Sequence, residues 1–522
     1  MDTKALRQKI LDLAIRGKLV PQDPNDEPAS VLLERIRAQK QQMVREGKLK
    51  SKDIKDDTVI FVGEDNLHYE KFADGSVKCI EDEIPFDLPD GWVWGRLTTL
   101  LDIFITGPFG SSLHKSDYVE NGIPLINPMN IVDGEIIPID KMQISNETVE
   151  RLASFKVIPN DIVIARRGDM GRCAVVHYTQ TGWLCGTGSF VLRLSTFLWP
   201  EYFAACIRSP YAVTYLSGNS IGNTMLNLNQ AILKNLLLPV PPFKEQKRII
   251  DGINNADAYL KQLSDEREHL IATVAKTKSK ILDLAIRGQL VPQNPADEPA
   301  TVLLDRIRAE KEELIRQGKI KRDKKESVIF RGDDNSYYEK VGGEVQCIDD
   351  NVPFELPEGW SFMRLKSAWE LISGRDLSPS EYNDESNGIP YITGASNFEN
   401  GQISVVRWTP VPQVFTYEGD LLLTCKGTIG EIALNKFGEA HIARQIMAIR
   451  NTYNLNVAFL SLCIEWSMEE IKQAAKGLIP GISREDILNL ILPVPPVEHQ
   501  KKIVRCVQTC SEKLNAIFRA LS

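Results

Sequence analysis

The chain has 522 residues, of which 43% are hydrophobic and 25% charged, so it is long enough for several globular domains with ordinary cores. It contains no run of about 18 apolar residues, and its charged start is unlike a signal peptide. We therefore expect a cytoplasmic protein without membrane contact. The net charge of −8 argues only weakly against nucleic-acid binding, because such binding depends on local basic patches.

A long internal repeat organises the chain. Residues 9–37 read KILDLAIRGKLVPQDPNDEPASVLLERIR and residues 280–308 read KILDLAIRGQLVPQNPADEPATVLLDRIR, with 24 of 29 positions identical. A second pair, NLLLPVPP at 235–242 and NLILPVPP at 489–496, recurs later in each half. The segments between these repeats differ much more. This pattern indicates one repeated scaffold, called the framework below, that carries two different inserts.

The first framework segment predicts two helices, at about 3–16 and 29–46. The repeat predicts a counterpart of the second helix at 300–317. The Lys/Asp-rich stretches that follow, 48–57 and 319–326, are expected to be solvated. The alternative for these stretches is an arm that contacts phosphates.

The inserts run from about 85 to 242 and from about 353 to 496. Short apolar runs separated by Gly, Asn and Asp predict β-strands, and longer stretches predict helices, so each insert should be an α+β domain. The strand runs lie at 123–126, 161–168 and 190–194 in the first insert and at 389–392, 420–427 and 446–450 in the second. The helical stretches lie at 199–217 and 455–476.

Between the inserts the sequence predicts one long helix of about 45 residues, or roughly 65 Å at 1.5 Å per residue. It follows Pro241-Pro242 and ends near Gly288, which is a typical C-cap residue. Its expected core positions have coiled-coil spacing: Ile249, Ile253, Ala256, Leu260, Leu263, Leu270, Val274, Ile281 and Leu284. This stripe predicts packing within the chain; docking of another protein's helices on the outer faces is a further option.

Alignment of the two halves shows that the ends of the chain add up to one copy of this central unit. Residues 497–522 match its beginning and residues 3–16 match its end. We therefore expect the second copy to pair antiparallel with the central helix. The predicted fold class is α+β, with two globular mixed domains separated by a pair of long antiparallel helices in a pseudo-twofold, circular internal repeat.

The sequence contains no GxxxxGK[ST] phosphate loop and no NPP[YF] methyltransferase motif, and residues 126–129 match the latter only in part. A nuclease-like pattern fails as well, because no second acid accompanies Asp420 and Lys426. Six histidines and nine cysteines without a CxxC pair form no recognisable metal site, and we expect the cysteines to be reduced thiols. The sequence thus predicts no catalytic residue, cofactor site or metal site in this chain.

A turn rich in glycine and basic residues follows a strand in each insert, at 166–172 and at 426–430. Glycine lets the backbone approach a ligand closely, and Arg or Lys can address phosphate or the acceptor edge of guanine. Comparable loops lie upstream, at 107–115 and 374–378. Each could be an ordinary β-turn, but their doubling with changed side chains favours contact loops. The candidate contact residues are Ser111, Ser112, His114, Lys115, Arg166, Arg167 and Arg172 in the first insert and Arg375, Lys426, Thr428 and Arg444 in the second.

These motifs resemble the specificity (S) subunit of type I restriction–modification systems. The framework repeat is characteristic of that family, as are LLLPVPPFKEQKRII at 236–250 and LILPVPPVEHQKKIV at 490–504, where a proline pair precedes Glu-Gln and a basic-hydrophobic helix. The second copy departs slightly, with Glu498-His499-Gln500 in place of Glu-Gln. The resemblance spans essentially the whole chain.

The resemblance implies a DNA-reading scaffold without chemistry of its own. In this family two target-recognition domains each read half of a bipartite sequence in double-stranded DNA. Two modification subunits supply S-adenosylmethionine and the adenine N6-methyltransferase site, and two restriction subunits supply ATP- and Mg-dependent translocation and cleavage. The domains expected here are an N-terminal framework at 1–84, target-recognition domain 1 at 85–242, a central spacer at 243–352, target-recognition domain 2 at 353–496 and a C-terminal framework helix at 497–522. Because the inserts differ, the target should be asymmetric.

Two alternatives stay open on the sequence alone. The first is a single-chain methyltransferase or nuclease, which would bind S-adenosylmethionine by itself. The second is a non-catalytic helical adaptor whose inserts bind protein partners instead of DNA. Salt-sensitive binding to duplex DNA would exclude the adaptor.

Overall fold

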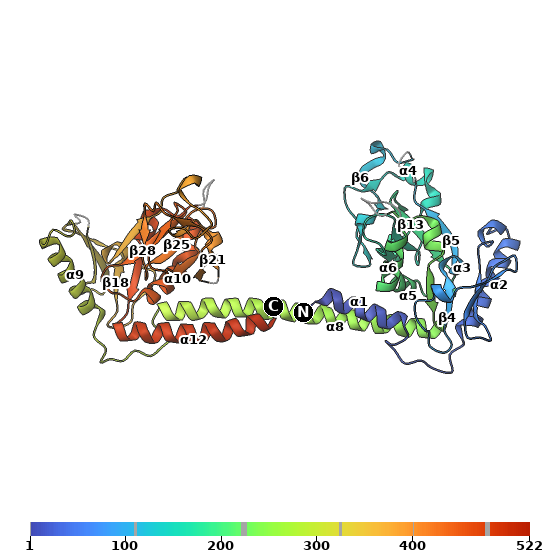
Figure 1. Ribbon diagram of the computed structural model, residues 1–522, viewed down its shortest axis with the longest axis horizontal. Helices are drawn as coiled ribbons and strands as arrows, with labels where there is room; N and C mark the ends of the chain where they lie inside the picture. The colour runs from blue at the N-terminus through green and yellow to red at the C-terminus, as the bar shows by residue number, and fades with distance from the viewer. Residues whose placement is uncertain are drawn as a thin grey trace. The chain divides into compact units, whose positions relative to one another are not determined.

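The computed structural model describes residues 2–108, 112–220, 227–322, 326–399, 401–474 and 481–521. The chain divides into two compact units, called unit 1 (Met1–Glu266) and unit 2 (Arg267–Ser522) (Figure 1). Each unit contains framework helices, a three-stranded sheet and a mixed α/β domain with its own buried core. The predicted α+β class and the long helices are confirmed.

The framework helices form close to where the sequence predicts them. Their bounds are α1 Thr3–Ile15, α2 Ala29–Arg45, α8 Phe243–Ile286, α9 Ala300–Arg316 and α12 Val497–Leu521. The 44-residue helix α8 starts directly after Pro241-Pro242, because proline cannot continue a helix interior. Gly47 and Gly318 follow α2 and α9 with φ of 73° and 69°, the left-handed conformation in which helices commonly end.

Within each unit, α8 pairs antiparallel with a framework helix. In unit 1, Nε of Arg7 on α1 lies 2.8 Å from Oδ1 of Asp257, while Arg248, earlier on α8, pairs with Asp26 beyond the end of α1. In unit 2, Nζ of Lys278 donates to Oδ1 of Asn515 on α12 at 2.6 Å. This is the pairing that the sequence predicts.

Two of the predicted core positions on α8 are wrong. Ile249, Ile253 and Leu260 are buried, but Leu263 and Leu270 are 48% and 47% exposed. Both lie in the stretch of α8 near which α1 begins and α12 ends, where little helix surface is available to cover them. The spacing identified the seam, but it does not distinguish a position that a partner helix covers from one beside the end of that helix.

The central sheets of the two units have the same strand order, β11-β10-β13-β5 in unit 1 and β26-β25-β28-β19 in unit 2. All their pairings are antiparallel. Their bounds in unit 1 are β5 Leu101–Thr106, β10 Ile162–Ala165, β11 Cys173–Val175 and β13 Ser189–Leu194. In unit 2 they are β19 Trp369–Ser373, β25 Leu421–Thr424, β26 Ile432–Leu434 and β28 Ile446–Asn451. β10 and β25 are buried at every residue, as expected of continuous apolar runs inside a domain.

Further short elements complete each domain. A parallel pair, β6 Tyr118–Ile126 with β12 Leu184–Cys185, has its counterpart in β20 Ile389–Ile392 with β27 Ala440–Ile442. The helical stretch predicted at 199–217 is split by Pro210 into two helices. The helices are α3 Leu97–Leu100, α4 Asn146–Arg151, α5 Pro200–Arg208, α6 Pro210–Asn219, α7 Gln230–Lys234, α10 Val457–Ala474 and α11 Arg484–Leu488. The remaining strands are β7 Ile131–Val132, β8 Glu135–Ile136, β9 Gln143–Ile144, β21 Phe398–Glu399, β22 Gln402–Ile403, β23 Trp408–Thr409 and β24 Phe415–Thr416.

Each insert begins and ends on two strands that pair with each other. β4 Val93–Arg96 pairs antiparallel with β14 Leu237–Val240, and β18 Ser361–Arg364 pairs likewise with β29 Ile491–Val494. The domain between them is therefore attached to the framework at one two-stranded base.

A three-stranded sheet that the sequence did not predict precedes each domain. It consists of β1 Val59–Val62, β2 His68–Lys71 and β3 Val77–Cys79 in unit 1, and of β15 Ser327–Arg331, β16 Tyr337–Val341 and β17 Glu344–Cys347 in unit 2. Its first turn contains Asn66 and Asn335 at positive φ, which asparagine tolerates better than most residues. These strands are short and mix polar with apolar residues, so their pattern is weak.

A buried ion pair fastens this sheet to the domain in each unit. Nη2 of Arg96 on β4 lies 2.8 Å from Oε2 of Glu70 on β2, and Nη1 donates to the carbonyl of Asn235. Arg364 and Glu339 form the same pair at 2.8 Å in unit 2. Both glutamate side chains are 4% exposed.

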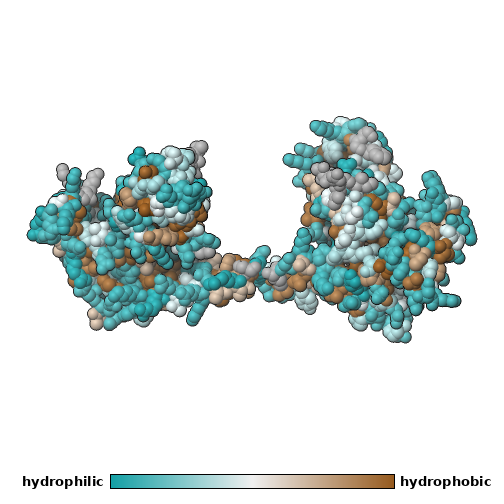
Figure 2. All heavy atoms as spheres, viewed as in Figure 1, coloured by the Kyte–Doolittle hydropathy of each residue, from teal (hydrophilic) through white to brown (hydrophobic). Residues whose placement is uncertain are grey.

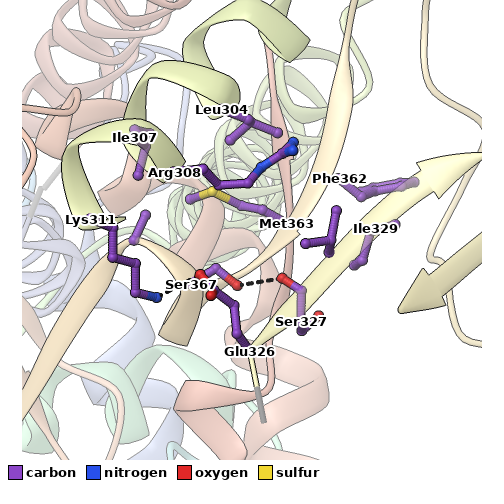
Figure 3. A pocket seen from close by; sticks show the side chains of 12 residues that line it. Leu304, Ile307, Arg308, Lys311, Glu326, Ser327, Ile329, Phe362, Met363 and Ser367 are labelled. Carbon is purple, nitrogen blue, oxygen red and sulfur yellow. Dashed lines mark hydrogen bonds and ion pairs between the residues drawn. The ribbon is translucent and has the colours of Figure 1, made fainter. Parts of the chain in front are cut away.

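A second ion pair connects the framework helix to the segment before the sheet. Figure 3 shows this junction in unit 2, where Nζ of Lys311 on α9 lies 2.9 Å from Oε1 of Glu326. In unit 1, Nζ of the buried Lys40 lies 2.6 Å from Asp57, whose side chain is 12% exposed. The expectation that 48–57 is solvated is thus wrong at Asp57, and also at Leu49, which is buried. Residues 323–325 of the second charged stretch lie outside the described residues.

None of the helices in the described ranges is long and apolar enough to cross a membrane.

Candidate nucleic-acid interface

In unit 1 three loops meet at one end of the central sheet, where β5 and β10 end and β11 and β13 begin. The amide of Gly107 donates to the carbonyl of Ser189 at 3.0 Å, and the amide of Arg166 donates to the carbonyl of Gly188 at 2.8 Å. The predicted turn at 166–172 and the start of the predicted loop at 107–115 therefore lie beside the loop at 186–189.

A fourth segment, directly before α7, reaches the same end of the sheet. Asn227 forms an isolated β-bridge with Arg167, and the amide of Leu228 donates to the carbonyl of Arg166 at 2.9 Å. The side-chain amide of Gln230 donates to Oγ1 of Thr106 at 2.7 Å. Residues far apart in the sequence are thus brought together around the glycine/basic turn.

Unit 2 has the same arrangement with different side chains. Lys426 forms the β-bridge with Gly481, and the guanidinium of Arg484 donates to Oγ of Ser373 at 2.8 Å. The amide of Gly374 donates to the carbonyl of Ile446 at 3.1 Å. The two units thus present one loop architecture with two sets of side chains.

The basic residues of the first turn differ in exposure. Arg167 is exposed, whereas Arg166 is half-buried, with its guanidinium carbon 4.7 Å from the centre of the Phe190 ring, and its burial lowers its pKa. Arg172 is half-buried as well, 3.9 Å from Asp169. Arg167 is therefore the side chain best placed to reach a ligand, and Arg166 supports the turn.

Several buried polar atoms at this end of unit 1 have no hydrogen-bond partner among the described residues. They are Nε of Arg166, Nε of Arg172, Oγ of Ser189 and Oδ1 of Asn227. Buried polar atoms are normally hydrogen-bonded, so their clustering marks a place where water or a ligand completes the interactions.

The other candidate contact residues of the first insert have their described contacts outside the turn at 166–172. Ser111 is outside the described residues. Ser112 is half-buried and its carbonyl accepts from Arg151, while the amide of the exposed His114 donates to Asp117. Lys115 is exposed.

In unit 2, the predicted residues Arg375, Lys426, Thr428 and Arg444 are all exposed. Nε of Arg444 lies 2.7 Å from Oδ2 of Asp376, so part of its charge is neutralised. Lys426 takes part in no ion pair within the described part of the chain. Arg375 likewise takes part in no ion pair within the described ranges, so these two exposed cations are the clearest candidates for contact with an anion.

A buried carboxylate–arginine pair fixes the central strands of each sheet. Asp161, fully buried just before β10, lies 2.7 Å from Nε of Arg193 on β13. Asp420 and Arg450 form the equivalent pair at 3.0 Å in unit 2. These pairs hold the strands in register and so keep the loops at their other end in place.

Sequence reasoning missed the loop at 186–189, Gln230 and Arg484. Gly186 and Gly188 could have been found, because small residues directly before a strand indicate close backbone approach. Gln230 and Arg484 occupy equivalent places when the framework repeats are aligned. Within the described ranges there is no group of three or more metal-ligating side chains.

Comparison with known proteins agrees with this architecture. Residues 89–271 and 357–520 match the family described as "Type I restriction modification DNA specificity domain". The EcoAI specificity subunit of a type I restriction enzyme from Escherichia coli is 27% identical, over 99% of this chain and 90% of that protein. The EcoEI specificity subunit from the same species is 25% identical, over 97% and 88%.

Solved structures share the fold. An HsdS subunit from Thermoanaerobacter tengcongensis matches with a TM-score of 0.51 and 20% identity, over 84% of this chain and 93% of that chain. A chain from a type I R-M system matches with a TM-score of 0.55 and 21% identity, over 84% and 94%. The chain belongs to the family of type I restriction–modification DNA specificity subunits.

Proposed function

We propose that the chain reads an asymmetric, bipartite DNA sequence for a type I restriction–modification complex and has no catalytic activity of its own. One observation carries the proposal: equivalent loops surround equivalent sheets in both units, but their side chains differ. Arg167 and Gln230 in unit 1 stand where Lys426 and Arg484 stand in unit 2. Two domains with the same loop arrangement but different contact side chains are suited to reading two different half-sites.

The exposed basic side chains give each unit a means of holding DNA. Arg and Lys neutralise phosphates, and Arg can also bond both acceptors of a guanine edge in the major groove. We assign the two target-recognition domains to 85–242 and 353–496, the framework to 1–84, 243–352 and 497–522, and the first contacts to Arg167 and Lys426. Family membership favours this function over the adaptor alternative.

The proposal includes the partners. Two modification subunits bring S-adenosylmethionine and the adenine N6-methyltransferase site, and two restriction subunits bring ATP- and Mg-dependent cleavage. The complex acts in the cytoplasm on double-stranded DNA. The duplicated framework supports two identical partners, because two equivalent surfaces can each bind one copy.

Long-read methylation mapping tests this function. Cells that express the chain with its modification subunit should carry an N6-methyladenine motif with two unlike halves, which disappears when this chain is deleted. Exchange of residues 85–242 for those of a relative should change one half of the motif and leave the other half unchanged. A motif that persists without this chain, or that changes in both halves, would contradict the proposal.

Lys426→Ala is expected to weaken DNA binding mainly through the loss of one phosphate contact. The slope of log affinity against log salt should then fall by about 1, with similar effects on target and non-target duplexes. Lys436→Ala is the matched control, because Lys436 is exposed beyond the opposite end of the same strand pair. Fluorescence anisotropy at several salt concentrations provides the measurement. Equal salt slopes for both variants and the parent would remove Lys426 from the interface.

A further inference from the structure

The outward faces of the two three-stranded sheets carry the same amino acids at equivalent positions. Cross-strand pairing places six side chains on this face in each unit. In unit 1 they are Val59, Phe61, Tyr69, Lys71, Val77 and Cys79. In unit 2 they are Val328, Phe330, Tyr338, Lys340, Val345 and Cys347. We call these two surfaces the outer patches.

The outer patches are exposed to the same extent. Phe61 and Phe330 are each 42% exposed, and Val77 and Val345 are 52% and 53% exposed. At the centre of the opposite faces, Glu70 and Glu339 are buried by their arginine partners. The ends of these faces are exposed, for example at Val62 and at Arg331. Hydrophilic residues cover most of the face seen in Figure 2, where hydrophobic residues occur in separate groups.

The opposite faces have changed more between the copies. Val62 corresponds to Arg331, His68 to Tyr337 and Lys78 to Gln346, and only the isoleucine and the glutamate are kept. Exposed apolar side chains that pack against little in the chain could become polar without loss of stability. Every position of the outer patches is identical, whereas exposed positions on the opposite faces differ, which indicates that the same contact is made outside the chain at both patches.

The aromatic centre of each patch is fixed before any partner arrives. The rings of Phe61 and Tyr69 stack with centroids 5.9 Å apart, and the Tyr69 hydroxyl donates to Oδ2 of Asp65 at 2.7 Å. Phe330 and Tyr338 repeat the 5.9 Å stack, and Tyr338 donates to Asp334 at 2.8 Å. Side chains already held in place lose less entropy on binding. In unit 2, a shallow hollow of about 370 Å³ is lined by Phe330, Gly332, Asp333, Asp334, Tyr338 and Val345.

The chemistry of the patches favours a protein partner. Lys71 and Lys340 are exposed and form no ion pair within the described ranges, so a carboxylate on the partner would complement them. The remaining patch residues are apolar or aromatic, and Asp65 and Asp334 stand beside them. Phosphates would be repelled by these acids and would gain little from one lysine.

We propose that the outer patches dock the modification subunit, one copy at each patch. This inference rests on the proposed function, in which the modification subunit is bound in two copies. Each outer patch is fastened to the domain of its own unit by the buried Glu70–Arg96 or Glu339–Arg364 pair. A methyltransferase must be held at a fixed position relative to the half-site that the domain reads, whereas a translocating subunit has no such need. The partner surface presents apolar side chains around a carboxylate.

The test counts the modification subunits bound by the full chain. Native mass spectrometry of the chain with its purified modification subunit should show two bound copies for the parent. Phe61→Glu and Phe330→Glu should each leave one copy, with about tenfold or greater loss of affinity at the altered patch, and the double variant should bind none. Ile137→Glu and Val411→Glu are matched controls, since these residues are 48% and 47% exposed elsewhere in the two units. Duplex binding by each variant shows that its domains remain folded.

The outcomes separate the docking proposal from the proposed function. Two copies on the double variant with parental affinity would overturn the docking site and leave DNA reading intact. The same measurement with the purified restriction subunit added gives a further outcome: loss of only the restriction subunit would overturn the docking site in favour of that partner. A parent chain that binds no modification subunit would overturn the proposed function together with the docking site.

Discussion

Replacement of Arg364 by methionine is expected to lower the free energy of unfolding of unit 2 by about 3–5 kcal/mol at neutral pH. Nε and Nη2 of Arg364 donate to the two carboxylate oxygens of Glu339 at 2.9 and 2.8 Å, and Nη1 donates to the carbonyl of Asn489 at 2.6 Å. The variant leaves a carboxylate that is 4% exposed without its cation. An unpaired buried charge lowers the free energy of unfolding by more than the loss of the hydrogen bonds alone.

The stability that this ion pair contributes depends on pH through the pKa of Glu339. The hydrogen bond from Arg364, with help from Ser327, lowers the pKa of Glu339 from 4.5 to about 2. A lowered carboxyl pKa stabilises the folded state above the unfolded value, and this stabilisation is lost as the pH falls from about 4.5 to about 2. The difference between the parent and Arg364→Met should therefore shrink over this range.

Hydrogen exchange at β16 and β18, measured as a function of denaturant, reports the stability of this part of unit 2. Arg306→Met is the matched control, because Arg306 forms a surface ion pair with Glu298 and is 60% exposed. Surface pairs contribute about 0–1 kcal/mol, so the control should change little. If Arg364→Met behaved like this control, the buried pair would not hold the sheet to the domain.

Gly374→Ala is expected to weaken recognition by unit 2 by about 5- to 150-fold, which corresponds to the roughly 1–3 kcal/mol cost of overpacking. A Cβ atom at Gly374 would lie 2.1 Å from the carbonyl oxygen of Ala443. Because this contact is with backbone, the loops that carry Arg375 and Arg444 must separate. The half-site read by unit 1 should be bound as before.

The control for this variant lies at the same end of the sheet. A Cβ atom at Gly481 would have the carbonyl oxygen of Cys425 as its nearest neighbour, at 3.6 Å, an ordinary contact. Gly481→Ala should thus bind like the parent. Anisotropy with duplexes altered in one half-site at a time provides the measurement. Equal losses at both half-sites would show that the alanine acts through general destabilisation.

The sequence predicted the elements whose patterns are long or strongly apolar. α8 was recognisable from its proline boundary and repeated spacing, and β10 and β25 from continuous apolar runs. The three-stranded sheets were missed because strands of three to five residues with mixed polarity carry little periodic signal. In these segments, the asparagine-containing turn was the one strong local indication of a β-hairpin.

The candidate interface was predictable only in part. The glycine/basic turns stand out in the sequence, but Gln230 and Arg484 reach the same end of the sheet from about sixty residues away along the chain. Tertiary folding alone brings them there. The packing of Arg166 on Phe190 likewise depends on a partner from another strand, so sequence could not separate Arg166 from Arg167.

The paired strands at the base of each domain have a genetic consequence. Because β4 and β14, or β18 and β29, lie side by side, the start and the end of an insert are held at a constant separation whatever lies between them. Exchange of an insert between related genes would therefore move a whole domain, together with its paired base strands, onto an unchanged framework. The recipient would need only to supply the glutamate that pairs with the arginine of the incoming domain. A population could thus acquire a new DNA target in one step, with the partner proteins unaltered.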